Sequence, residues 1–323
     1  MWPGLRQWVP VLVCLAFASV KLSCATYDSR KPLRAAAILT VALSVNFLFM
    51  LATIYILPSF SRGRLHVLRE SMIADLTGQE LSCIPVGQFL RSAFAAERPL
   101  LAVNVAGCLP FETEFPAIDM LGLNDWYIAR HRPPDMGNGP LAHELGDGRY
   151  VLSRHPDLIE LPERGGSPEP TYRGDFEIVK AQEFRRNYRL VYFGASPPLS
   201  LWVRIDGGNL GIVRHKDDIH IPGFLFASTP GARAIADRSG KPVAMLTSGD
   251  ALIRDVDLPS GVWKVSLETD AASRMQLATL PSAKVNRVGV GTLRVVSDGE
   301  PYSFRVFGGQ GLIYAVNARR VTE

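Results

Sequence analysis

The longest hydrophobic run covers residues 35–57, which pass without a charged side chain. At about 1.5 Å of rise per residue, a helix of this length spans the roughly 30 Å hydrocarbon layer, and Pro58 then ends the run. A shorter run, "WVPVLVCLAFASV", lies between Arg6 and Lys21. It predicts either a second membrane helix, with Lys21 reaching the interface, or the hydrophobic core of a signal peptide. We favour a transmembrane hairpin over residues 1–58.

After the hairpin, the pattern changes to amphipathic segments that predict a small α/β unit over residues 59–165. Apolar residues at helical spacing indicate helices over 64–78 and 86–96. "PLLAVNVAG", from Pro99, and "PAIDMLGL" read as strands, and "NDWYIARHR" starts a helix with Asn124 or Asp125 as its cap. Residues 131–149 are rich in glycine and proline and predict a long loop.

Short alternating runs then dominate residues 166–323, beyond the linker "GGSPEP". Turn residues separate these runs, and no long helix is expected among them. The pattern predicts an antiparallel β-sandwich or jelly-roll domain, so the whole chain is a membrane-anchored α+β protein. The runs are "FEIV", "YRLVYFG", "LSLWVRI", "GVWKVSLE", "GTLRVVS" and "YSFRVFG".

Charge and motif content exclude several classes of function. The formal net charge is only +4 and no long basic run occurs, so nucleic acid is not an expected partner. The chain contains no GxSxG, P-loop, GxGxxG or HExxH motif. His131, His143 and His155 recur every 12 residues, but equal spacing on a loop does not bring ligands together. We therefore predict no metal site and no cofactor, with a divalent metal as the remote alternative.

Polar residues beside the second predicted strand are the candidate substrate-binding residues. Asp119 ends that strand, where α/β units place functional groups, but it could equally hold loop amides. Asn124 reads more readily as a helix cap than as a ligand. Trp126 reads mainly as a packing residue, although an aromatic face beside carboxylates also suits sugar rings. The full candidate set is Asp119, Asn124, Asp125, Trp126, His143 and Glu144.

Residues 101–162 resemble a region near the C-terminus of bacterial membrane glycosyltransferases of the GT-C type, the arabinofuranosyl- and mannosyltransferase-like proteins of the cell envelope. One departure is Ala142-His143, where the family has Gly-His. The segments that carry the resemblance are "VGQFLR" (86–91), "AVNVAGCLPF" (102–111), "AIDMLGLNDWYIAR" (117–130), "AHELGDGRYVL" (142–152) and "RHPDLIEL" (154–161).

The resemblance implies the extracytoplasmic C-terminal part of an enzyme that uses a polyprenyl-phosphate sugar. In such enzymes a multi-helix membrane half carries the catalytic Asp, and no position here corresponds to it, so whether this chain is an enzyme stays open. The expected partners are membrane lipid, the lipid-linked sugar, a glycan acceptor and the missing membrane half. The alternative is a non-catalytic, membrane-anchored envelope protein whose β-sandwich binds glycan or a protein partner.

Counting Lys and Arg does not decide the orientation of the hairpin, because four lie on each side of the membrane. The short connecting loop has the denser cluster. Placing that loop in the cytoplasm puts everything from Ser59 onward outside, in a bacterial inner membrane and periplasm. In that oxidising compartment Cys83 and Cys108 are a candidate disulfide, because a helix followed by a strand returns both to one edge. Two buried free thiols are the alternative.

Overall fold

A computed structural model describes residues 21, 83–137, 143–161, 169–194, 199–270, 274–280 and 285–321. Apart from Lys21, these residues belong to one compact unit, Asp75–Glu323. Within this part of the chain, no helix is long and apolar enough to cross a membrane. The predicted transmembrane hairpin and the helix predicted over 64–78 lie outside the described residues.

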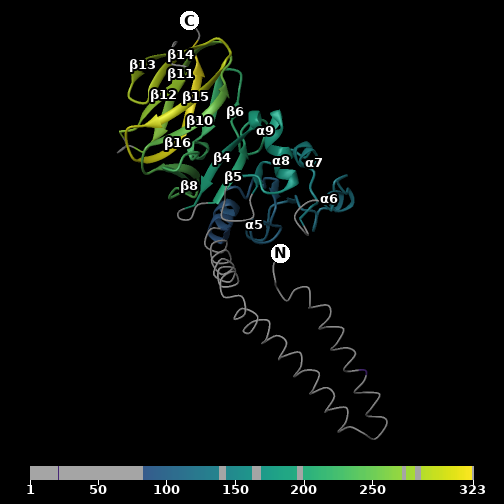
Figure 1. The fold of residues 1–323 in the computed structure, drawn as a ribbon. Helices are drawn as coiled ribbons and strands as arrows, with labels where there is room; N and C mark the ends of the chain where they lie inside the picture. The colour runs from purple at the N-terminus through teal and green to yellow at the C-terminus, as the bar shows by residue number, and fades with distance from the viewer. Residues whose placement is uncertain are drawn as a thin grey trace, which may run out of the picture. The chain divides into compact units, whose positions relative to one another are not determined.

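The first half of the unit is built around three short parallel strands. β1 lies between β2 and β3 and pairs with both. In Figure 1 the blue and teal first half of the unit carries the labelled helices, and the green-to-yellow second half is mostly strands. The strands and helices predicted around Asp119 and Asp125 are present, as is a helix over 83–93, close to the predicted 86–96. After the helix over 83–93, the elements of this half are β1 (Leu101–Val103), α5 (Cys108–Thr113), β2 (Ala117–Asp119), α6 (Trp126–Arg130), α7 (Gly148–Ser153) and β3 (Leu158–Glu160).

Helices cover both faces of these strands. The helix over 83–93 places Val86 and Leu90 in the same core as Leu101 and Val103 on one face of β1. Ala102, between them, points to the other face, where a second core gathers side chains from α6, α7 and two later helices. Alternation along β1 therefore divides the molecule into two hydrophobic cores.

The strand predicted at "FEIV" is part of the first of two consecutive helices. They are α8 (Arg173–Lys180) and α9 (Gln182–Asn187). The prediction was wrong because four residues are too few to separate a period of two from one of 3.6. The side chain of Asp175 accepts hydrogen bonds from the backbone amides of Thr171 and Tyr172, which starts α8. Ile178 and Phe184 then turn into the second core.

The rest of the unit is sheet, as the alternating runs predict. Among the described residues one large sheet has the strand order β13-β14-β11-β16-β9-β8-β4-β5-β3-β1-β2, with β7 beside β16 and β6 beside β7; a small sheet has the order β10-β15-β12. The strands are β4 (Tyr188–Phe193), β5 (Leu199–Arg204), β6 (Val213–Arg214), β7 (Asp218–Pro222), β8 (Ala232–Ala236), β9 (Pro242–Leu246), β10 (Asp250–Asp257), β11 (Gly261–Thr269), β12 (Gln276–Leu280), β13 (Val285–Gly289), β14 (Thr292–Ser297), β15 (Pro301–Phe307) and β16 (Gly311–Arg320), with a 3₁₀ helix, η3 (Gly223–Phe226), after β7.

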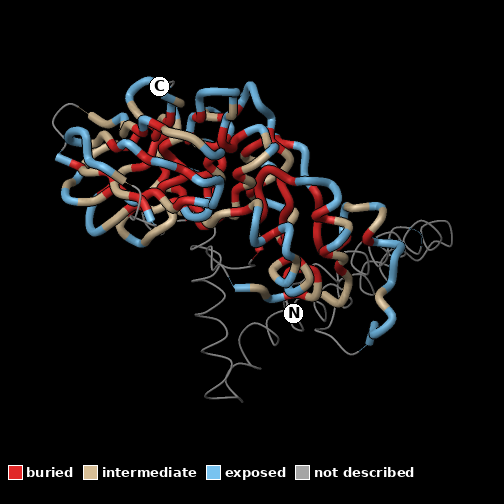
Figure 2. Tube along the Cα trace, turned by 90° about the horizontal axis from the view of Figure 1, so that it is seen from above, coloured by how far each residue is buried: buried red, intermediate tan, exposed pale blue. Residues whose placement is uncertain are grey.

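The two sheets share a core. Trp263 and Val265 of the large sheet are buried in the same cluster as Phe304 and Val306 of the small one. Figure 2 shows buried stretches of the chain inside the unit and exposed stretches along its outside. The unit is thus mostly β-sheet with few helices.

The large sheet also runs through the predicted boundary at residues 165–166. β3, before the boundary, pairs antiparallel with β5, after it, through Leu158 and Val203. α7 and α8, from either side of the boundary, contribute Val151 and Ile178 to one core. The two predicted domains therefore share a sheet and a core.

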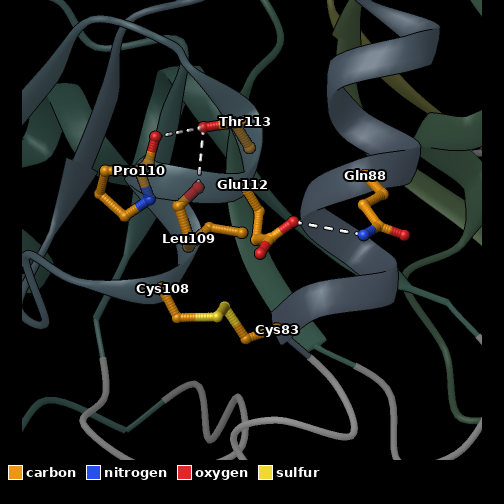
Figure 3. Close-up of a disulfide and its surroundings, with 7 residues drawn as sticks. All are labelled: Cys83, Gln88, Cys108, Leu109, Pro110, Glu112 and Thr113. Carbon is orange, nitrogen blue, oxygen red and sulfur yellow. Dashed lines mark hydrogen bonds between the residues drawn. A yellow bond between two sulfur atoms is a disulfide. The ribbon is translucent and has the colours of Figure 1, made fainter.

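Cys83 and Cys108, the candidate pair, form a disulfide whose Cα atoms lie 6.3 Å apart. The bridge joins the helix over 83–93 to the start of α5 (Figure 3). A Cβ at Gly87 would lie 2.5 Å from the Cβ of Glu112, so only glycine permits this close approach of the two helices.

Candidate functional site

The carboxyl ends of β1, β2 and β3 form the edge that the candidate residues occupy. After β1 the chain continues into α5, which packs in one core, whereas after β2 it continues into α6 and α7, which pack in the other. Neighbouring strands whose connections go to opposite faces create a crevice in open α/β sheets. Register places Asp119 of β2 and Glu160 of β3 on either side of Val103. Two acidic side chains therefore flank the middle strand at this edge.

Asp119 holds the loop that follows β2. Its side chain is 4% exposed, and its two oxygens accept hydrogen bonds from the amides of Leu121, at 3.0 Å, and Asn124, at 2.6 Å. Gly122, with φ of +75°, lets the chain turn between these amides. Of the two roles weighed for Asp119, the structure shows the one in which it binds loop amides.

Asp125, rather than Asn124, caps α6. One oxygen of Asp125 accepts hydrogen bonds from the amides of Tyr127 and Ile128, both at 2.9 Å. Its other oxygen accepts from the hydroxyl of Tyr150 at 3.2 Å. Asn124 is exposed and contributes its backbone amide to Asp119.

A row of stacked rings lies beside this cap. The ring of Tyr127 stacks on His131, with centroids 3.8 Å apart, and on Tyr150, at 4.1 Å. Arg154 donates a hydrogen bond to the hydroxyl of Tyr150 at 3.0 Å. Partial burial, and next the charge of Asp125, raise the pKa of Tyr150, so the hydroxyl keeps its proton as a donor.

The sequence had suggested that Trp126 is mainly a packing residue, but the structure shows it exposed. Its side chain is 70% exposed, and the guanidinium of Arg130 lies over its ring. α6 turns Ile128 into the core, and Trp126 lies about 200° from Ile128 on a helix with 100° per residue. We call Asp125, Trp126, Tyr127, Arg130 and Tyr150 the α6 aromatic surface.

His143 and Glu144 lie in the long loop before α7. The imidazole of His143 stacks on Tyr172, with centroids 5.3 Å apart, and the carboxylate of Glu144 accepts a hydrogen bond from the amide of Gly137. These contacts tie the loop to the start of α8 and to itself.

The three regularly spaced histidines have separate surroundings. His131 lies on Tyr127, His143 on Tyr172, and His155 is 3.5 Å from Glu183. In the part of the chain that the structure describes, no three His, Cys, Asp or Glu side chains gather as potential metal ligands.

Two polar features of this region were missed in the sequence. The first is Asn104, just after β1, which donates its side-chain amide to Asp175 of α8. The second is Glu160, whose Oε2 is buried without a hydrogen-bond partner among the described residues. Burial raises the pKa of Glu160 to about 8. An acid within the apolar run "DLIEL" was the available signal for Glu160.

A family model described as a domain of unknown function (DUF8728) matches residues 72–207. The matched stretch contains the α6 aromatic surface and all elements from the helix over 83–93 to β5, so it also crosses the predicted boundary at 165–166. No curated protein and no solved structure matches the chain.

Proposed function

We propose that the chain is the extracytoplasmic, sugar-binding part of a membrane-anchored, GT-C glycosyltransferase-like protein of the bacterial inner membrane. In this proposal the α6 aromatic surface binds the glycan acceptor. The polyprenyl-phosphate sugar and the catalytic Asp belong to a separate multi-helix membrane half. The sequence resemblance and the uncharged run over residues 35–57 support the membrane and family parts of the proposal.

The exposed indole of Trp126 is the observation that carries the binding role. An aromatic face offers apolar contact to the C–H face of a sugar ring. Exposing that face to water is unfavourable, and a ligand that covers it removes this free-energy cost. The guanidinium of Arg130 supplies donors, and the oxygen of Asp125 that faces Tyr150 keeps a second lone pair as an acceptor, for sugar hydroxyls beside that face.

Three candidate carboxylates, those of Asp119, Asp125 and Glu144, are engaged in ways that argue against a catalytic role for them. Both side-chain oxygens of Asp119 accept hydrogen bonds from backbone amides, and the carboxylates of Asp125 and Glu144 also accept from backbone amides. A catalytic acid needs a lone pair or proton directed at the substrate. The same observation favours the second candidate function, a stand-alone, non-catalytic envelope protein that binds glycan.

Glycan binding by the full-length chain tests the proposal. Saturation-transfer NMR and calorimetry would use short mannose and arabinofuranose oligosaccharides as probes. Trp126→Ala should weaken binding by roughly tenfold, equivalent to about 1.4 kcal/mol. The matched control is Phe176→Ala, which removes another exposed aromatic ring, on α8. No binding by the wild type, or equal affinity for both variants, would remove the proposed role of this surface.

The proposed location has its own test. A phosphatase fused after residue 323 is active only outside the cytoplasm, whereas a fluorescent reporter at the same position reports the cytoplasm. We expect an active phosphatase fusion in a bacterial host. An inactive phosphatase with a bright fluorescent fusion would place the domain in the cytoplasm.

A further inference from the structure

An open groove crosses the outward face of the large sheet, over β7, β16 and β11. Its volume is about 530 Å³, and its lining includes His220, Asn317 and Lys264. The intervening side chains on the same strands, among them Ile219, Trp263 and Val265, turn inward and are buried. Alternation along the strands therefore gives this sheet one apolar face and one polar face.

Cross-strand register arranges the polar side chains in two rows. The first row is Ser266, Asn317 and His220, one from each of the three strands. The second row is Lys264, Arg319 and Asp218, at the neighbouring outward positions. With strands about 4.8 Å apart, each row extends about 10 Å across the sheet.

Two members of the first row, Asn317 and His220, lie in a chain of oriented hydrogen bonds that begins at Glu268. The side-chain amide of Asn317 donates to Glu268 at 3.4 Å, because a carboxylate can only accept. The carbonyl oxygen of Asn317 therefore faces the Nδ1 of His220, 2.7 Å away, and that nitrogen carries the proton. The Nε2 of a neutral His220 is then left as an acceptor for a hydroxyl group.

The second row carries an excess of positive charge. Arg319 donates to Asp218 at 2.8 Å, which neutralises one of its two cations. Lys264, directly opposite Arg319 in the register, makes no ion pair with any residue that the structure describes. Like charges opposite each other on neighbouring strands are unfavourable, and an anionic group bound between them would relieve that repulsion.

We propose that this β7–β16–β11 groove binds an acidic oligosaccharide, such as a uronic-acid chain. Sugar hydroxyls would bond to Ser266, Asn317 and His220, and a carboxylate of the sugar would lie between Lys264 and Arg319. The row of hydrogen-bonding groups beside a row of cations matches a ligand that is both polyhydroxylated and anionic. This inference does not rest on the role proposed for the α6 aromatic surface.

Calorimetry of the full-length protein with trigalacturonic acid tests the groove, with the neutral trisaccharide maltotriose as the comparison ligand. Lys264→Ala should weaken trigalacturonate binding roughly five- to tenfold and make it less sensitive to salt. Asn317→Asp, which keeps the size of the side chain, should weaken it at least as much by adding a negative charge. The matched control, Lys241→Ala, removes an exposed lysine in the turn between β8 and β9 and should leave affinity unchanged.

Four results would overturn the proposal. They are the absence of saturable trigalacturonate binding, tighter binding of maltotriose, equal effects of Lys264→Ala and Lys241→Ala on affinity, and displacement of trigalacturonate by inorganic phosphate as effective as by the trisaccharide itself. Thermal melts of every variant would show that loss of binding is not loss of folding. Trp126→Ala should bind trigalacturonate normally, which separates this test from that of the α6 aromatic surface.

Discussion

Asn104 donates its side-chain amide to both carboxylate oxygens of Asp175, 71 residues further along the chain, at 2.9 and 3.0 Å. Both side chains are buried. Asp175 also accepts from the amides of Thr171 and Tyr172, so one carboxylate joins the end of β1 to the start of α8. This contact spans the boundary that the sequence pattern had suggested.

Replacing Asp175 with alanine should therefore destabilise the protein by about 2–4 kcal/mol, because the amides of Thr171 and Tyr172 lose their acceptor and Asn104 keeps only the carbonyl oxygen of Leu161. Urea unfolding, followed by tryptophan fluorescence, would measure the change. Asp217→Ala, at an exposed position before β7, is the control and should change stability by less than about 0.5 kcal/mol. Equal losses for both variants would contradict the role of Asp175.

Asp119→Ala should destabilise the protein more than Trp126→Ala, although the sequence had suggested Trp126 as a packing residue. Asp119→Ala leaves two amides without their acceptor and should cost about 1–3 kcal/mol. Trp126→Ala removes an exposed ring and should change stability by no more than about 0.5 kcal/mol. Parallel thermal melts would decide, and a larger loss for Trp126→Ala would mean that its ring is covered.

Glu160 should make stability fall as pH rises. Its pKa is raised by burial to about 8, from an ordinary value near 4.5. Between these two values the folded state holds a proton that the unfolded state has released, so raising the pH favours unfolding. The effect should approach ~1.4 kcal/mol per pH unit within that window and level off above pH 8.

Glu160→Gln provides the measurement, because its side chain is nearly isosteric and cannot ionise. The difference in unfolding free energy between variant and wild type should grow in favour of the variant from about pH 5 to pH 8. Other titrating groups cancel in this difference. A constant difference across the range would show that Glu160 titrates normally.

The Cys83–Cys108 bridge closes a loop between residues 25 positions apart. Replacing both cysteines with serine should lower stability by roughly 2–4 kcal/mol, mainly because the unfolded chain gains freedom. Urea unfolding of the purified protein, with and without reductant, would test this. The double variant should match the reduced wild type, and an effect of reductant on the double variant would point to another cause.

The local elements of the first half were predictable because their signals lie within a few residues. A helix capped by Asn124 or Asp125 was predicted and Asp125 is the cap, and the strand predicted in "PAIDMLGL" is present as β2. The alternation in runs such as "GVWKVSLE" likewise predicted β11 as a strand. In each case the secondary structure depends on residues that are close together in the sequence.

Long-range pairing could not be read in the same way. Nothing near Leu158 shows that it will pair with Val203, or that Asn104 will meet Asp175, because such contacts depend on how loops close. The exposure of Trp126 follows from the shortness of α6, whose single inward position is Ile128. The groove over β7, β16 and β11 needs the register of three strands that are far apart in sequence.

The position of β16 bears on how fast the protein folds. β16 pairs with β7, β9 and β11, and its Asn317 meets a histidine 97 residues earlier. Each of these pairings requires a long loop to close, and the entropy lost in closing it is offset only after the strands are in contact. Such topologies fold in milliseconds to seconds rather than microseconds. Until β16 docks, β7 and β11 present open edges to other chains, so the interval before docking is when aggregation competes with folding.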